Sequence, residues 1–103
     1  MKENGDCYLV AGQMIMDINV DGALLCHGNP IGQGEIKGIK HNHAWIEIND
    51  IVLDFSNGNR IITWKNKYYD LGKIKDSEVK KYIRSEATAN MLDAGHYGPW
   101  IKK

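Results

Sequence analysis

The sequence predicts an α+β fold in which an N-terminal helix packs on an antiparallel β-sheet of about four or five strands, with a C-terminal helix after the sheet. Three observations predict it: apolar residues at helical spacing after Gly5-Asp6, two alternating runs that flank Asn49-Asp50, and a second helical segment that stops at Gly95. The chain has 103 residues, the length of one domain, so we expect a single domain over 1–103.

Composition and charge narrow the classes of function. Thirteen Lys and Arg balance thirteen Asp and Glu, which argues against a protein that binds nucleic acid by bulk charge. Residues 1–59 hold three basic and eight acidic side chains, whereas residues 60–103 hold ten and five, so the N-terminal half is acidic. The apolar runs are short and the N-terminus is polar, which predicts neither a transmembrane span nor a secretory signal. We therefore expect a cytoplasmic protein with reduced cysteines and no membrane partner.

The first element is predicted as a helix from Cys7 to about Ile18, with Asp6 as the N-cap and Cys7 as the first helical residue. A short apolar strand, Ala23–Cys26, follows the turn at Asp21-Gly22. The glycine-rich segment from His27 to Lys40 is too irregular for a helix and predicts a long loop.

The next segment predicts a β-hairpin, with strands His43–Ile48 and Ile51–Ser56 joined by a two-residue turn at Asn49-Asp50. Cross-strand partners then have numbers that add to 99, and parity assigns the faces. One face is wholly apolar and holds Ala44, Ile46, Ile48, Ile51, Leu53 and Phe55. The other holds His43, Trp45, Glu47, Val52, Asp54 and Ser56, a mixture typical of a functional site.

The C-terminal half is predicted element by element from weaker patterns. Arg60–Thr63 is predicted as a strand, Trp64–Tyr69 as a turn or short helix, and Val79–Ile83 as another strand. Ser85 is predicted to cap a helix over Glu86–Ala94 that ends at Gly95. The aromatic tail His96–Trp100 is expected to pack against the body of the domain.

Cys7, His43 and Asp54 together suggest nucleophilic catalysis. A thiol attacks as the thiolate, which a helix N-terminus favours, so the position of Cys7 suits a nucleophile. Such a nucleophile requires a general base and a group that orients the base. Within the predicted hairpin Asp54 is the diagonal neighbour of His43 on one face, at roughly 7 to 8 Å between backbones, within reach of an imidazole and a carboxylate.

The order of Cys at a helix start, His-Ala-Trp-x-Glu entering a strand, and Asp on the next strand resembles the transglutaminase-like branch of the papain-like cysteine enzymes. The glycine-rich loop and Gly95–Trp100 are also similar to small proteins common in bacteriophage genomes. The first resemblance implies a papain-like core with Cys7 as nucleophile, His43 as base and acid, and Asp54 as orienter. It implies a peptidase, amidase or transglutaminase-like transferase, with a peptide or small amide as substrate and no cofactor. The phage resemblance implies the cytoplasm of a bacterial host.

Stabilisation of the oxyanion leaves alternatives open. The backbone N–H of Cys7 supplies one donor, and Gln33, Asn42 or the indole of Trp45 is expected to supply the second. The remaining chemistry-bearing side chains have structural explanations: Cys26 as core, His27 and His41 as loop or surface residues, Glu47 as an exposed strand residue, and the lysines from Lys73 to Lys81 as a solvated face.

Two other classes of function compete with the enzyme. A non-catalytic binding or inhibitor module could have the same fold without the chemistry. A zinc site built from Cys26, His27, His41 and His43 is the less favoured alternative, because no Cys-x-x-Cys pair is present.

Overall fold

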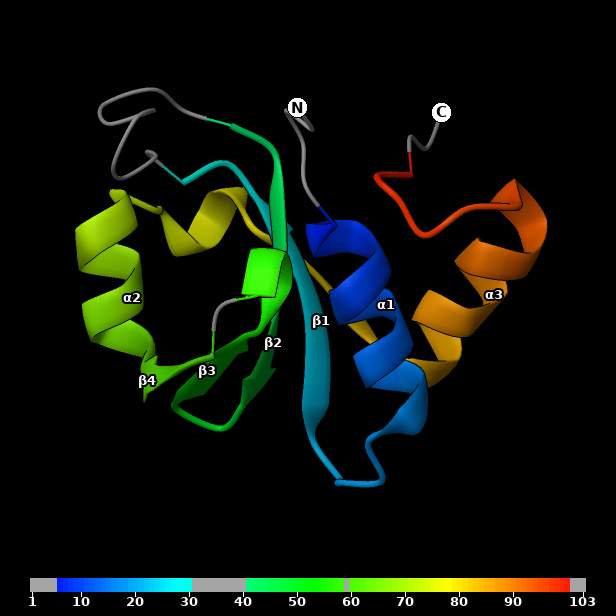
Figure 1. The fold of residues 1–103 in the computed structure, drawn as a ribbon, viewed down its shortest axis with the longest axis horizontal. Helices are drawn as coiled ribbons and strands as arrows, with labels where there is room; N and C mark the ends of the chain where they lie inside the picture. Colours follow the sequence, from blue (N-terminus) through cyan, green and yellow to red (C-terminus); the bar gives the residue numbers. More distant parts are fainter. Residues whose placement is uncertain (1–5, 31–40, 59, 101–103) are drawn as a thin grey trace.

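The fold, seen in a computed structural model that describes residues 6–30, 41–58 and 60–100, is the predicted combination of helices and one antiparallel sheet (Figure 1). Its regular elements, in chain order, are α1 (Cys7–Asp17), β1 (Ala23–Gly28), β2 (His43–Ile48), β3 (Ile51–Asp54), β4 (Ile61–Trp64), α2 (Lys65–Gly72), β5 (Lys80–Ile83) and α3 (Arg84–Ala94). Short 3-10 turns at Ser56–Gly58 and Asp76–Glu78 complete it. None of the helices in this described part is long and apolar enough to cross a membrane.

The five strands form one sheet in the order β4-β3-β2-β1-β5, and every neighbouring pair is antiparallel. The β2–β3 hairpin has the predicted register, because Ile46 pairs with Leu53, Glu47 with Val52 and Ile48 with Ile51. Asn49 begins the turn with a φ of 55°, a left-handed conformation that Asn tolerates better than most residues. The hairpin therefore fixes which side chains share a face.

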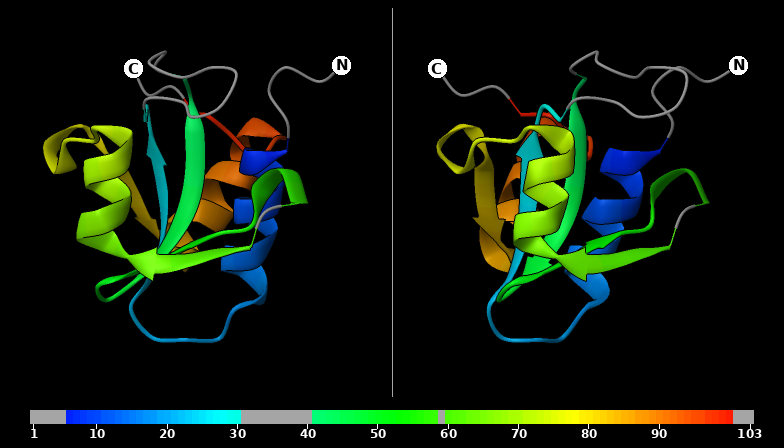
Figure 2. Two further views of the ribbon diagram at one scale, coloured as in Figure 1. Left: turned by 60° about the vertical axis from the view of Figure 1, so that its left-hand side comes forward. Right: turned by 90° about the vertical axis from the view of Figure 1, so that its left-hand side faces the viewer.

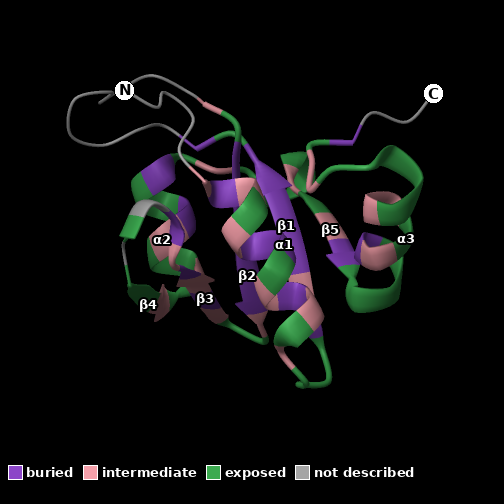
Figure 3. Cartoon of the chain, turned by 45° about the vertical axis from the view of Figure 1, so that its right-hand side comes forward, coloured by how far each residue is buried: buried purple, intermediate pink, exposed green. Residues whose placement is uncertain are grey.

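Helices cover both faces of the sheet: α1 and α3 lie on one face and α2 on the other (Figures 1 and 2). The larger core lies under α1 and α3 and includes the predicted apolar hairpin face. Its buried members are Ala11, Ile15, Ala23, Leu25, Ala44, Ile46, Tyr82, Ala87 and Trp100. A smaller core under α2 contains Cys26, Trp45, Val52 and Tyr69. Burial is concentrated in β2, the central strand, and in its neighbour β1 (Figure 3).

β1 runs two residues beyond its predicted end. His27 and Gly28, expected in the loop, pair with Ala44 and His43 of β2, and His27 also pairs with Lys80 of β5. His27 is 6% exposed, which corrects its assignment as a loop or surface residue. Its ring lies 4.8 to 5.2 Å from the rings of Tyr8, Tyr82 and Trp100. Of the rest of the predicted loop, Asn29 and Pro30 have no regular structure, and residues 31–40 are outside the described residues.

The C-terminal helix begins at Arg84, so the prediction of Ser85 as its N-cap is wrong. Ile83 occupies the cap position, and its backbone N–H donates to Glu86 Oε1 at 3.0 Å, which satisfies one of the unpaired groups of the first turn. The helix ends at Gly95 as predicted, with a φ of 79° that glycine adopts at little cost. The tail packs on the body as expected, since Trp100 is buried.

Candidate active site

Cys7 lies where α1 begins, next to the ends of β2 and β3. It is 3% exposed and lines a narrow gap between α1 and the hairpin, together with Ala44 and Asp54. Asp6 stands at the N-cap position as predicted. Because the first backbone N–H groups of a helix have no partner within the helix, the start of α1 favours negative charge at Cys7.

His43 and Asp54 meet as the hairpin register predicted. His43 opens β2 and Asp54 closes β3, and His43 Nε2 lies 2.8 Å from Asp54 Oδ2. Both residues are buried. The imidazole and the carboxylate therefore form a buried charge-assisted hydrogen bond at the same end of the sheet as Cys7.

Asp54 accepts four hydrogen bonds from the described residues, one of them from His43. Ser56 donates to Oδ1 through its hydroxyl at 2.8 Å and its backbone N–H at 3.2 Å, and the Tyr68 hydroxyl donates to Oδ2 at 2.7 Å. Burial alone would raise the pKa of Asp54, but the bonds from His43, Tyr68 and Ser56 outweigh it and lower the pKa to about 2. The carboxylate is therefore ionised at neutral pH.

His43 is held in its charged form by its neighbours. Burial by itself lowers the pKa of the imidazole, but hydrogen bonds to Asp54 and to Cys7, with the charges of both, raise it to about 9. Since Nε2 is bonded to Asp54, Nδ1 is the ring nitrogen left to bond the Cys7 thiol. His43 thus interacts with both of the other residues that the sequence selected, Cys7 and Asp54.

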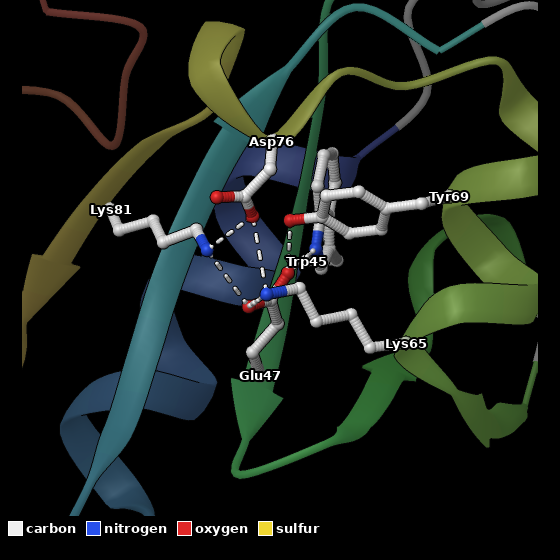
Figure 4. Close-up of polar contacts among 6 residues, drawn as sticks. All are labelled: Trp45, Glu47, Lys65, Tyr69, Asp76 and Lys81. Carbon is white, nitrogen blue, oxygen red and sulfur yellow. Dashed lines mark hydrogen bonds and ion pairs between the residues drawn. The ribbon is translucent and has the colours of Figure 1, made fainter.

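Trp45 and Glu47 lie on the same face of β2 as His43. They belong to a second buried polar cluster (Figure 4). The Trp45 ring is nearly parallel to that of His43, with centroids 6.2 Å apart and an interplanar angle of 28°. Its indole N–H donates to Glu47 Oε2 at 3.1 Å. That donor is therefore committed to Glu47, which argues against Trp45 as the second oxyanion donor.

Glu47 is 2% exposed, so its assignment as an exposed strand residue is wrong. The reason is that α2 and β5 cover this end of β2: the Tyr69 hydroxyl donates to Glu47, and Lys81 and Lys65 lie 3.6 and 3.9 Å from Oε1. Both lysines also pair with Asp76, at 2.7 and 3.1 Å (Figure 4). The cluster joins β2, α2 and β5, and the Trp45 indole is one of its members.

Of the other two predicted oxyanion donors, Asn42 lies within the described residues and Gln33 does not. Asn42 precedes His43 and is exposed, and its Oδ1 accepts a hydrogen bond from Asn29 Nδ2 at 2.5 Å. That bond occupies the carbonyl oxygen of the amide and keeps the N–H₂ group for another acceptor. Gln33 lies outside the described residues.

Of the four residues of the zinc alternative, His41 and His43 come together, with ring centroids 5.3 Å apart, but Cys26 and His27 do not join them. Cys26 packs with Trp45 in the core under α2, whereas His27, the next residue of β1, points to the opposite face among Tyr8 and Trp100. Within residues 6–30, 41–58 and 60–100, no group of three or more His, Cys, Asp or Glu could hold a metal ion. The geometry gives that alternative no support.

Two residues of the site, Ser56 and Tyr68, were not selected from the sequence. Ser56 had a detectable signal, because hairpin parity puts it on the same face as His43 and Asp54. Tyr68 had none, since its segment predicted either a turn or a short helix and nothing indicated which strands it would contact.

Comparisons with protein-family models, curated proteins and solved structures found no match to this chain. A function for this chain is therefore inferred from the geometry of the site.

Proposed function

We propose that the chain is a cysteine-dependent acyl-transfer enzyme, a peptidase, amidase or transglutaminase-like transferase, acting on an amide or isopeptide bond of a peptide or small molecule. The observation that carries the proposal is the 2.8 Å contact of His43 Nε2 with Asp54 Oδ2 in a ring that also interacts with Cys7, at the start of a helix. A papain-like or transglutaminase-like core fits this layout of helix, hairpin and triad. The chemistry requires neither metal nor cofactor.

In this mechanism the Cys7 thiolate attacks the carbonyl carbon, a C–S bond forms, and negative charge develops on the carbonyl oxygen beside the Cys7 backbone N–H. His43 transfers its proton to the leaving amine as the C–N bond breaks, which leaves a thioester. Water or a second amine then attacks the thioester, His43 accepts its proton, and Cys7 leaves as the thiolate. Asp54 holds the imidazole orientation throughout and stabilises its charged form.

The burial of Cys7 sets a condition on this mechanism. With 3% of its surface exposed, Sγ meets a substrate carbonyl only when the residues around the first turn of α1 move apart. The same burial favours the second candidate, a binding or inhibitor module of the phage type in which the thiol performs no chemistry.

The deciding experiment measures the rate of Cys7 alkylation by iodoacetamide from pH 5 to 10 in a Cys26→Ser background. We expect reaction well below pH 8, and a slowing of about tenfold or more at pH 7 in His43→Ala, because the imidazolium no longer stabilises the thiolate. His96→Ala is the matched control, since it removes an exposed imidazole from the tail and leaves the triad intact.

The alternatives predict different results. Identical pH profiles for the parent and His43→Ala would remove the enzyme proposal and favour the binding module, which should also tolerate Cys7→Ser without loss of binding. A profile that depends on His43 would justify a search through peptide and amide substrates for the bond that is cleaved or transferred.

A further inference from the structure

Two consecutive tyrosines of α2 reach two buried carboxylates on neighbouring strands. The Tyr68 hydroxyl donates to Asp54 Oδ2 at 2.7 Å, and the Tyr69 hydroxyl donates to Glu47 Oε2. Only the first of these carboxylates binds His43. The two tyrosine hydroxyls are therefore chemically identical, but that of Tyr68 contacts the proposed triad and that of Tyr69 lies outside it.

Tyr68 and His43 share one oxygen of Asp54. Both donate to Oδ2, while Ser56 occupies Oδ1 from within the same chain segment. Ser56, two residues along the chain, thus holds Oδ1 of the carboxylate, whereas Tyr68 holds Oδ2 from α2. Burial next to the Asp54 charge raises the pKa of Tyr68, so its hydroxyl remains a donor over the whole working range of pH.

The Tyr68 ring makes a second contact with the site. Its centroid lies 5.3 Å from that of Trp45, whose ring in turn lies beside His43. The Tyr68 hydroxyl therefore contacts Asp54 and the Tyr68 ring contacts Trp45, and these two side chains define where the His43 imidazole points. α1 supplies the thiol, the hairpin supplies the imidazole and carboxylate, and α2 supplies this support from the opposite face of the sheet (Figure 2).

We propose that Tyr68 is a positioning residue of the site, which holds the Asp54 carboxylate in the orientation that binds His43 and so presents the imidazole to Cys7. This inference rests on the proposed function. Tyr68 acts through Asp54 and does not itself touch the reacting atoms. A purely structural role would instead make Tyr68 equivalent to Tyr69.

The test compares Tyr68→Phe with Tyr69→Phe, each in the Cys26→Ser background. Both substitutions remove one buried hydroxyl and keep the ring, so the loss of unfolding stability is comparable. We expect Tyr68→Phe to slow Cys7 alkylation at pH 7 by about three- to tenfold, less than the full effect of losing one hydrogen bond to a charged group because His43 and Ser56 still hold Asp54, while Tyr69→Phe stays within about twofold of the parent. Ser56→Ala combined with Tyr68→Phe should slow it further.

A second readout does not depend on the thiol. The Asp54 carboxyl carbon, followed by NMR from pH 2 to 6, should titrate at higher pH in Tyr68→Phe, since the ionised form loses a donor, and should not move in Tyr69→Phe. Equal effects of the two substitutions on alkylation and on this titration would overturn the inference. If alkylation responds to His43→Ala but not to Tyr68→Phe, the positioning role fails while the proposed function stands. If the rate of Cys7 alkylation does not change in His43→Ala, the proposed function fails, and the positioning role that rests on it fails as well.

Discussion

At the scale of single residues, the site depends on one buried carboxylate that accepts four hydrogen bonds within the described part of the chain. A buried ionised group is costly unless it is paired and hydrogen-bonded, and Asp54 is 5% exposed. His43, Tyr68 and Ser56 offset that cost between them. Because the same bonds keep the carboxylate ionised and the imidazole protonated, removal of the Asp54 charge should affect both.

Asp54→Asn tests this dependence with almost no change of side-chain volume. The pKa of His43 should fall from about 9 toward the ordinary value of 6.5, because the amide supplies no negative charge. NMR titration of the His43 ring measures the shift, and Cys7 alkylation at pH 7 should slow by about tenfold. A ring that still titrated near 9 would show that Asp54 does not set its charge. Asp70→Asn, on the exposed side of α2, is the control.

The two cysteines should react very differently in the native protein, although both are buried. Cys7 lies in the first turn of α1, and helix ends open at low free energy, whereas Cys26 lies in β1 between β2 and β5, where opening approaches global unfolding. Burial also raises the pKa of the Cys26 thiol. Iodoacetamide should therefore add one equivalent, at Cys7, with Cys26 modified only in denaturant. Peptide mapping measures this, and early modification of Cys26 would contradict the assigned burial.

How far the site could be predicted differs from residue to residue. His43 and Asp54 could be paired from the sequence because hairpin parity depends only on a two-residue turn and local alternation. Glu47 and Tyr68 could not be placed, because their partners come from α2 and β5, and no local pattern states which strand a short helix covers. Long-range packing, rather than local propensity, decides these contacts.

At the scale of elements, the structure departs from the prediction where tertiary contacts extend or shift a boundary. β1 continues to Gly28 because β2 and β5 pair with it on both sides. α3 starts at Arg84 because Glu86 reaches back to Ile83. The hairpin register and α1 needed no such help, since turn chemistry and helical periodicity act over a few residues, although β3 ends at Asp54 and the predicted strand residue Ser56 begins a 3-10 turn.

At the end of β1, Gly28 packs closely against Trp45, whose ring lies beside His43. A Cβ added at Gly28 would lie 2.7 Å from Trp45 Cη2, too near for any real contact. Trp45 is fully buried and tied to Glu47, so it has little room to retreat except toward His43. Gly28→Ala should lower the free energy of unfolding by about 1 to 3 kcal/mol and displace the His43 ring.

Chemical denaturation and the NMR signals of His43 measure the two effects of Gly28→Ala. Ala94→Gly, at the exposed end of α3, is the comparison, because it lowers stability through helix propensity alone and should leave the His43 signals in place. Unchanged stability in Gly28→Ala would mean that Trp45 moves freely, against the packing described here.

At the scale of the whole molecule, the pKa values of two buried histidines on the same sheet are shifted in opposite directions. His43 has charged partners, which raise its pKa to about 9. His27 is enclosed by aromatic rings, and neither of its ring nitrogens has a hydrogen-bond partner among the described residues. Burial, with the nearby charge of Lys80, lowers the pKa of His27 to about 4.

These opposite shifts predict a stability maximum near pH 6.5. As pH falls from 6.5 to about 4, the unfolded chain protonates His27 before the native state does, so stability falls. As pH rises from 6.5 to about 9, the unfolded chain loses the His43 proton first, so the contribution of His43 to stability falls. The Asp54 contribution is retained throughout this range, because it is lost only as pH drops below 3.8 toward about 2. Each limb amounts to at most about 3 kcal/mol.

Urea denaturation at half-unit steps between pH 4 and 9 measures the profile, and two substitutions separate its limbs. His27→Phe should flatten the acid limb and His43→Ala the alkaline limb, each without affecting the other, because the two rings lie on opposite faces of the sheet with different partners. The slopes are informative even if a substitution changes stability at every pH. A profile that rose or fell steadily from pH 4 to 9 would show that the burial of His27 and the charge of His43 do not govern folding. Only a maximum whose two sides respond to the two substitutions separately fits both histidine environments.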